Sequence, residues 1–243
     1  PFGIVLVLDR LSALLLLLTA VVALASLLAG FAIAGRGPHF HAFFQFQLAG
    51  LHGAFLTGDL FNLFVFFEVL LIASYALLLH DAKGRTLRAG LHFVVINLVG
   101  SAFFLLAASL LYGVTGTLNF ADLALRLADL PDHDAGLARA AAMLLLVVFA
   151  IKAALLPLGF WLPETYAAAP GPVAVLFAVM TKVGIYGIVR VSMLMYGAGE
   201  GPLAGWGGVT MLVLGLATIA FGALAALAAP GLAALAGALV HEP

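Results

Sequence analysis

Three isolated charged residues stand inside long apolar stretches of this sequence: Glu68, Lys152 and Lys182. Glu68 lies in residues 60–79, which carry no other charge and are long enough to cross a bilayer as a helix. A carboxylate there costs on the order of 2.5–3.5 kcal/mol on insertion scales, and intramembrane charges commonly serve a function. Because the three groups differ in sign, their pattern indicates a pathway for charge.

A glutamate and a lysine placed together at membrane depth can act as a proton switch. Burial disfavours the charged form of each group, and an opposite charge nearby favours it again. Protonation of the glutamate would break the pair and free the lysine to release its own proton. The alternative for Glu68 is a structural carboxylate that ties its helix to a neighbouring one.

Lys152 lies five residues before Pro157 in a stretch that is otherwise apolar. Proline lacks an amide hydrogen, and its ring clashes with the carbonyl four residues earlier, here that of Ala153. We therefore expect the helix to be kinked or broken beside the lysine, as in the ion sites of transporters. The alternative is an interfacial lysine whose side chain extends to the membrane surface.

Lys182 lies near the centre of its apolar stretch, and Tyr186 follows one helical turn later on the same face. The two side chains could share a chain of hydrogen-bonded water. His52 and His92 could relay protons. A hydrogen-bonded histidine packed in a helical core is an equally good interpretation of either position.

The composition is that of a membrane protein. The 243 residues are 65% hydrophobic and only 9% charged, with a mean hydropathy of +1.23, whereas soluble domains carry about 25% charged residues. A net charge of −1 argues against a nucleic-acid partner. The absence of cysteine excludes disulfides and iron–sulfur ligation by this chain. Because no further ligands accompany His39 and His41, we expect no metal site. The sequence shows no nucleotide, flavin or quinone signature, so we expect no cofactor.

Seven stretches are apolar and long enough to span a bilayer as helices. They are residues 11–35, 37–58, 59–80, 89–112, 140–161, 173–196 and 205–229. The sequence therefore predicts an all-α, polytopic transmembrane bundle of about seven spans, with a broken helix near Pro157. Gly50 and Gly53 mark the second span as a close-packed or irregular helix.

Residues 117–130 differ from the spans, because polar residues alternate there with leucine and phenylalanine. This pattern predicts a short amphipathic element at the membrane surface. The loop at residues 80–88 is mostly basic, and the segment at residues 122–134 is mostly acidic. The positive-inside rule places the basic loop in the cytoplasm and the acidic segment outside, although Arg126 and Arg139 weaken this assignment.

Residues 58–75, which contain Glu68, closely resemble the D subunits of Mrp-type multisubunit sodium/proton antiporters. The Ala-Ser-Tyr ending at residues 73–75 is more similar to these subunits than to those of respiratory complex I. Other stretches are similar to the antiporter-like module that the Mrp antiporters share with the complex I membrane arm and with membrane-bound hydrogenases. They are residues 116–119, 151–163 and 181–186. The resemblance runs from about residue 5 to residue 225.

The resemblance implies roles for the three charged residues. Glu68 matches the essential glutamate on the family's fifth helix, Lys152 the lysine of a broken seventh helix, and Lys182 the lysine of the eighth. The seven spans would be the third to ninth helices of about fourteen. The family core is an inverted repeat of two five-helix bundles, of which this chain would hold the first and the start of the second.

The sequence departs from the family near its C-terminus. Residues 1–227 form the expected, partial antiporter-like transmembrane domain, and residues 228–243 form a low-complexity tail. A truncation or a shifted reading frame would explain this tail. Because the chain begins with Pro1 and lacks the second half-channel, we read it as a piece of a longer protein.

Three functions are consistent with the sequence. The first is membership of a monovalent cation/proton antiporter, a secondary transporter rather than an enzyme, that exchanges protons for Na⁺ in a prokaryotic cell membrane. Its partners would be other membrane subunits and the lipid bilayer. The second is a proton-pumping role in the membrane part of a complex I-like NADH:quinone oxidoreductase or a membrane-bound hydrogenase. The third is a structural role in a membrane complex, in which the charges form fixed interhelical pairs.

Overall fold

The computed structural model describes residues 4–31, 39–79, 84–196 and 207–228, and these residues form a bundle of helices. The helices are α1 (Arg10–Phe31), α2 (Phe40–Leu56), α3 (Leu60–Leu79), α4 (Arg85–Thr115), α5 (Phe120–Ala128), α6 (Ala135–Lys152), α7 (Leu162–Ala168), α8 (Gly171–Tyr196) and α9 (Gly208–Leu227). The predicted all-α transmembrane fold is confirmed. The C-terminal tail proposed from the sequence lies outside the described residues beyond residue 228.

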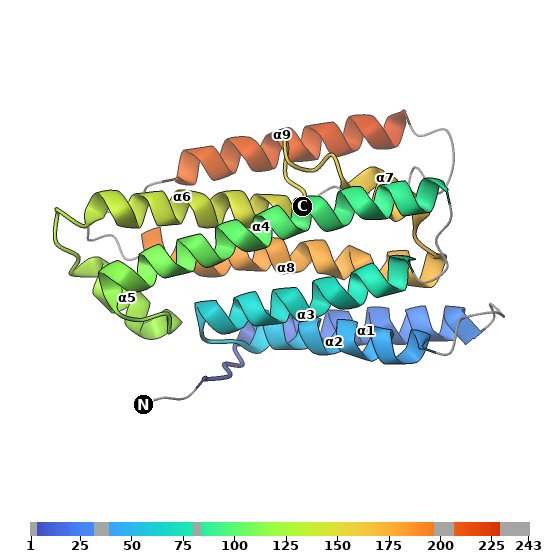
Figure 1. Cartoon of the computed structure of the whole chain (residues 1–243), viewed down its shortest axis with the longest axis horizontal. Coiled ribbons are helices and arrows are strands. Elements are labelled where there is room, and N and C mark those ends of the chain that lie inside the picture. Colours follow the sequence, from blue (N-terminus) through green and yellow to red (C-terminus); the bar gives the residue numbers. More distant parts are fainter. Residues whose placement is uncertain (1–3, 32–38, 80–83, 197–206, 229–243) are drawn as a thin grey trace.

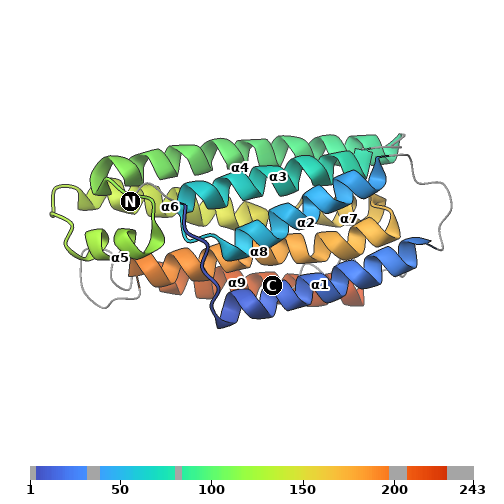
Figure 2. The ribbon, with the colours of Figure 1, turned by 90° about the horizontal axis from the view of Figure 1, so that it is seen from below.

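The long helices run side by side along one axis, as transmembrane helices do (Figures 1 and 2). Six described helices are long and apolar enough to cross a membrane: α1, α3, α4, α6, α8 and α9. α2, with 17 residues, is shorter and lies antiparallel to α3 in a hairpin. The predicted count of about seven spans therefore corresponds to these six helices together with α2.

Glycines bring α2 and α3 into close contact. A Cβ atom built at Gly50 would lie 2.6 Å from the Cβ of Leu70, and one at Gly53 would overlap the ring of Phe66. These contacts confirm the close packing predicted for the second span, because only a glycine leaves room for the neighbouring helix. This packing fixes the rotation of α3 about its axis, and therefore the direction in which the side chain of Glu68 points.

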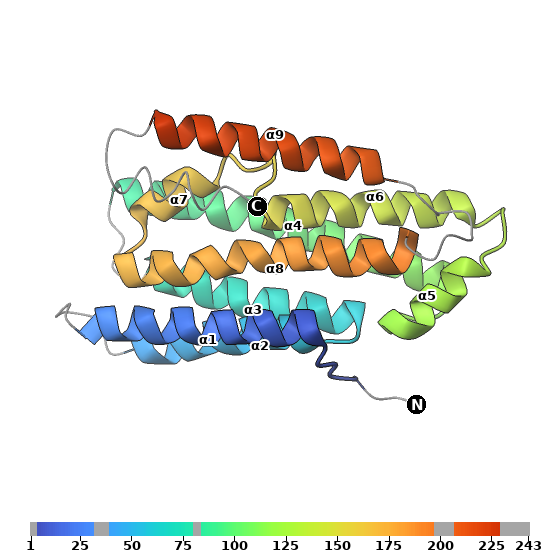
Figure 3. The same cartoon turned by 180° about the vertical axis from the view of Figure 1, so that it is seen from behind.

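The predicted amphipathic element is α5, a short helix across one end of the bundle (Figure 3). Its apolar side chains Phe120, Leu123 and Leu127 are buried, whereas Leu125 is 68% exposed. Asn119 caps the helix, because its side-chain oxygen accepts hydrogen bonds from two backbone amides of the first turn. α4 begins with basic residues at the opposite end of the bundle (Figure 1).

Candidate functional site

Ser101 of α4 joins Glu68 of α3 to Lys152 of α6. Its hydroxyl donates a hydrogen bond to Oε1 of Glu68, and Nζ of Lys152 donates to the same hydroxyl oxygen at 3.4 Å. A serine hydroxyl can donate and accept at once. The acid and the base are therefore linked through one side chain that is able to pass a proton.

The hydroxyl of Ser101 also has a second acceptor. The backbone carbonyl of Asn97, one turn earlier on α4, lies 3.0 Å from it and accepts from Nζ of Lys152 at 3.4 Å. The single hydroxyl proton can therefore turn toward Glu68 or toward the Asn97 carbonyl. Asn97 and Ser101 are four residues apart and therefore share one face of α4, but the link to the glutamate and the lysine becomes visible only when the helices are packed.

Lys152 is buried in an aromatic environment, with 4% of the residue exposed. Its Nζ lies 5.6 Å from the centre of the Phe67 ring, a distance that favours a cation–π contact. That ring belongs to a cluster of three aromatic rings whose centres lie 5.6–6.3 Å apart: Phe67, Phe104 and Phe149. The ammonium group of Lys152 is bonded to α4 inside the bundle, so the structure differs from the alternative of a lysine that extends out of the bundle.

α6 ends at Lys152, and the chain then runs without regular helix to α7. Ala154 has φ +57°, and the amide of Leu155 bonds the carbonyl of Ala150, five residues back, at 2.8 Å. Pro157 lies inside this segment and has no amide hydrogen to continue a helix. The predicted helix break beside the lysine is confirmed, and it places Lys152 at the end of a helix within the bundle.

Side chains add hydrogen bonds to backbone groups on both sides of the break. The indole Nε1 of Trp161 donates to the carbonyl of Ile151 at 3.1 Å, and its ring stacks on Phe93 with centres 5.1 Å apart. On the other side, the amide of Leu156 donates to Oγ1 of Thr218 on α9 at 3.0 Å. Because buried backbone groups need partners, these bonds hold the break in one shape.

α8, which carries Lys182, is pressed against the break. A Cβ atom at Gly184 would lie 2.5 Å from the backbone nitrogen of Ala153, and one at Gly187 would lie 2.7 Å from the ring of Phe149. Lys182 itself is half-buried on α8, whereas the hydrogen bonds from Glu68 and Lys152 meet at the Ser101 hydroxyl of α4. The structure thus brings two of the three predicted residues together and places the third on an adjoining helix.

Tyr186 belongs to a second polar network at the α5 end of the bundle. Its hydroxyl donates to the carbonyl of Phe55 at 3.0 Å and accepts from Nε of Arg190 at 3.1 Å. Nη1 of Arg190 lies 2.5 Å from Oδ2 of Asp9, and Nη2 donates to Ser12 at 3.1 Å. The sequence analysis missed Arg190, although a charge eight residues after Lys182 in the same span was a signal for it.

Comparison with known proteins decides the family. The family model described as NADH:quinone oxidoreductase/Mrp antiporter, transmembrane, matches residues 57–233, which include α3 to α9. The chain belongs to this family. Within the NADH:quinone oxidoreductase/Mrp antiporter family, it is 52% identical over 240 residues to the D subunit of a probable K(+)/H(+) antiporter of Rhizobium meliloti, covering 98% of this chain and 44% of the relative. It is 43% identical over 230 residues to the D subunit of a Na(+)/H(+) antiporter of Alkalihalophilus pseudofirmus, and the match covers 93% of this chain and 45% of that relative.

Two solved structures share the fold over almost the whole chain. One is the membrane-bound sulfane sulfur reductase, an archaeal respiratory membrane complex, with TM-score 0.89, 32% identity, and coverage of 100% of this chain and 49% of that one. The other is the Mrp complex from Dietzia, with TM-score 0.82, 32% identity, and coverage of 99% of this chain and 44% of that one. The chain therefore spans about half the length of the family members it matches.

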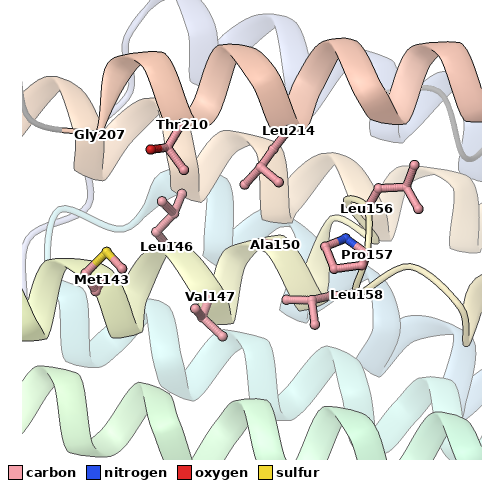
Figure 4. A pocket seen from close by; sticks show the side chains of 10 residues that line it. All are labelled: Met143, Leu146, Val147, Ala150, Leu156, Pro157, Leu158, Gly207, Thr210 and Leu214. Carbon is pink, nitrogen blue, oxygen red and sulfur yellow. The ribbon is translucent and has the colours of Figure 1, made fainter.

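The histidines and the proline predicted as weaker site residues are not among the groups that bond the Ser101 hydroxyl in the described part of the chain. His92 is exposed on α4. His52 of α2 is half-buried, and among the described residues its Nε2 atom and the side-chain amide of Gln47 are buried without a hydrogen-bond partner. Pro157 lines an apolar pocket of about 390 Å³ between α6, the break and α9 (Figure 4). Proton relay through the histidines stays a prediction.

Proposed function

We propose that this chain is part of a monovalent cation/proton antiporter, in which protons pass through Glu68, Ser101, Lys152 and Lys182 in exchange for Na⁺. The observation that carries the proposal is the Ser101 hydroxyl, which contacts both Glu68 and Lys152. An acid and a base at membrane depth, bridged by a group that both donates and accepts, form a short proton wire.

The geometry supports a simple sequence of proton steps. When Glu68 takes up a proton, it no longer attracts the lysine, and the Ser101 hydroxyl is free to turn to the carbonyl of Asn97. Lys152 then loses the charge that stabilised its ammonium form and can release its proton toward Lys182 in this low-dielectric site. The neutral amine is refilled when the Ser101 hydroxyl gives it a proton and takes the one held by Glu68. Lys182 is the next carrier, because α8 contacts the break directly after Lys152 at Gly184.

The relatives support both the partners and the location. Those named above are D subunits of antiporters from bacteria, and one structural neighbour is an Mrp complex. We place this chain in the plasma membrane of a prokaryote, in contact with lipid and with other membrane subunits of its complex. Na⁺ is the proposed cation, and K⁺ is the alternative suggested by the name of the Rhizobium relative.

Everted membrane vesicles that contain the complete complex test this proposal. Respiration builds a proton gradient, a pH-sensitive dye reports it, and Na⁺ or K⁺ is then added separately. We expect the gradient to fall with one of the two cations, and this response to disappear in an assembled Glu68→Ala complex. A cation response that survives in the assembled variant contradicts the role of Glu68.

A second candidate is a proton-pumping role in a redox complex. The observation that favours it is the likeness to the archaeal respiratory complex, whose TM-score of 0.89 is above that of the Mrp complex. The same residues would move protons, but an electron-transfer reaction would supply the energy. This candidate would be favoured over the antiporter if proton uptake by the vesicles requires an electron donor and does not change when Na⁺ or K⁺ is added.

A further inference from the structure

A pocket of about 390 Å³ opens at the end of the bundle that carries α5. Its wall combines apolar side chains with the polar residues Thr57 and Asn119, and Arg190 of α8 lines it from within the bundle. A volume of this size holds on the order of ten water molecules. The pocket is therefore a recess with room for water that reaches a charged side chain inside a transmembrane helix.

The segment before α1 forms one side of this pocket. The amide of Val7 donates to the carbonyl of Leu56 at 2.6 Å, and the amide of Gly58 donates to the carbonyl of Val5 at 2.8 Å. This pairing places Asp9 beside Arg190, where their side chains approach to 2.5 Å. The guanidinium is thus fixed at the inner wall of the pocket.

Behind Arg190, one face of α8 leads toward the centre of the membrane. Arg190, Tyr186 and Lys182 follow one another at four-residue spacing, which places them along one face of the helix. Nε of Arg190 donates to the Tyr186 hydroxyl, and Tyr186 is only 2% exposed. Lys182 comes one turn deeper, so the guanidinium and the tyrosine separate the pocket from the lysine.

We infer that this pocket is the aqueous mouth of a proton route to Lys182, and that Arg190 is the residue that gates it. The inference rests on the proposed function in one respect, because it takes Lys182 as a proton carrier. Arginine stays charged at all physiological pH values, and a fixed arginine in a narrow path repels cations. The ion pair with Asp9 and the bond to Tyr186 hold this barrier in place.

Thiol labelling tests the gate without any transport measurement. These 243 residues contain no cysteine, so Lys182→Cys adds one thiol to this part of the complete complex, and the unsubstituted complex gives the background from all other thiols. A cationic, membrane-impermeant methanethiosulfonate is added from the α5 side. We expect the labelling rate to rise at least about tenfold when Arg190→Ala is added, because charge in a cleft changes on-rates by 10–10³.

Arg126→Ala is the matched control, because Arg126 is an exposed arginine of α5 at the same end of the bundle. It should leave the labelling rate unchanged, and Arg190→Lys should keep the rate low. An equal rate with and without Arg190, or labelling of the Lys182→Cys thiol only from the opposite side of the membrane, overturns the inference.

A second pair of variants tests the mouth even if Arg190→Ala fails to assemble. Ala121→Cys places a thiol in the pocket wall, whereas Leu125→Cys places one a turn later on the same exposed face of α5, at a residue that does not line the pocket. Each complex is compared with itself before and after modification by a bulky thiol reagent. Proton flux should fall after modification at position 121 and persist at position 125, and an equal response at both positions overturns the inference. A complex without any cation-driven flux would instead refute the proposed function, while the labelling rates would still test the gate.

Discussion

Ser101 and Glu68, which are 33 residues apart in the chain, share a hydrogen bond between α4 and α3. The same hydroxyl accepts a hydrogen bond from Nζ of Lys152 on α6 at 3.4 Å. Three helices that are separate in sequence thus meet at one oxygen atom. Hydrogen bonds through this hydroxyl link two charged residues that are isolated from each other in the sequence.

Removal of the bridging hydroxyl should slow proton movement without unfolding the bundle. We expect Ser101→Ala to lower the cation-driven proton flux on the order of 10²-fold, the usual loss when a proton-transferring group is removed. Ser101→Thr, which keeps a hydroxyl, should retain more of the flux. Flux is measured in everted vesicles at matched complex levels.

Ser109→Ala is the control for this prediction. Ser109 lies two turns later on the same helix, and its exposed hydroxyl donates to the carbonyl of Leu105 in its own helix at 2.8 Å. Its substitution should leave the flux near that of the unsubstituted complex. A Ser101→Ala complex as active as the Ser109→Ala complex would show that the hydroxyl carries no proton.

The contact between α8 and the helix break should tolerate no side chain at Gly184. A methyl group there would lie 2.5 Å from the backbone nitrogen of Ala153, so Gly184→Ala must displace one of the two helices, at a cost of about 1–3 kcal/mol. Gly215→Ala is the matched control in α9, where a Cβ atom would meet no described residue within 4 Å. The thermal midpoint of the purified complex should fall for the first variant only; equal midpoints would contradict this close packing.

Trp161 should stabilise the break through one hydrogen bond. Trp161→Phe keeps an aromatic ring against Phe93 but removes the donor to the Ile151 carbonyl. The carbonyl keeps the amide of Ala154 as a donor at 3.2 Å, so the expected loss is about 0.5–1.5 kcal/mol, typical of one hydrogen bond. A fall in the thermal midpoint with unchanged subunit composition would agree with this prediction, whereas a variant as stable as the parent would contradict it.

The Asp9–Arg190 pair should make stability depend on pH in the acid range. The hydrogen bond from Arg190, with a further one from the Ser12 amide, holds the pKa of the Asp9 carboxyl well below its usual range. A depressed folded-state pKa adds stability above the unfolded-state value of about 4, and this stability is lost as the pH falls toward the folded-state pKa. The unsubstituted complex should therefore be more stable than Asp9→Asn near neutral pH, and the difference should shrink in acid.

Thermal midpoints of both complexes over a pH series measure this difference. Asp132→Asn, in an exposed loop at the same end of the bundle, provides the comparison and should follow the unsubstituted complex at every pH. A constant gap between Asp9→Asn and the parent across the series would mean that the carboxylate charge is not the source of the stability.

Much of the fold and part of the site could be predicted from the sequence. The lone charges at positions 68 and 152 were visible because an apolar span makes any ionisable residue conspicuous. The break followed from Pro157, since proline cannot continue a helix. The amphipathic α5 followed from the spacing of its apolar residues.

The remaining features depend on how helices pack, which the sequence does not state. Ser101 is a common polar residue in a span, and its role depends on α3 and α6 both turning a charged side chain toward it. The sequence also placed Asp9 outside the first span and gave no reason to pair it with Arg190, which lies 181 residues away. Both contacts join segments that are distant along the chain, so periodicity and composition carry no signal for them.

The most direct test of the proton path is a double-mutant cycle on its two ends. Glu68→Gln, Lys152→Met and the double variant are compared in everted vesicles by their cation-driven proton flux, with assembly checked in the same membranes. If the two residues act in one path, each single variant loses the flux and the double variant is no worse, because residues that act as a unit are not additive. An assembled Glu68→Gln complex with normal flux, or losses that add in the double variant, would contradict a shared path through the two residues.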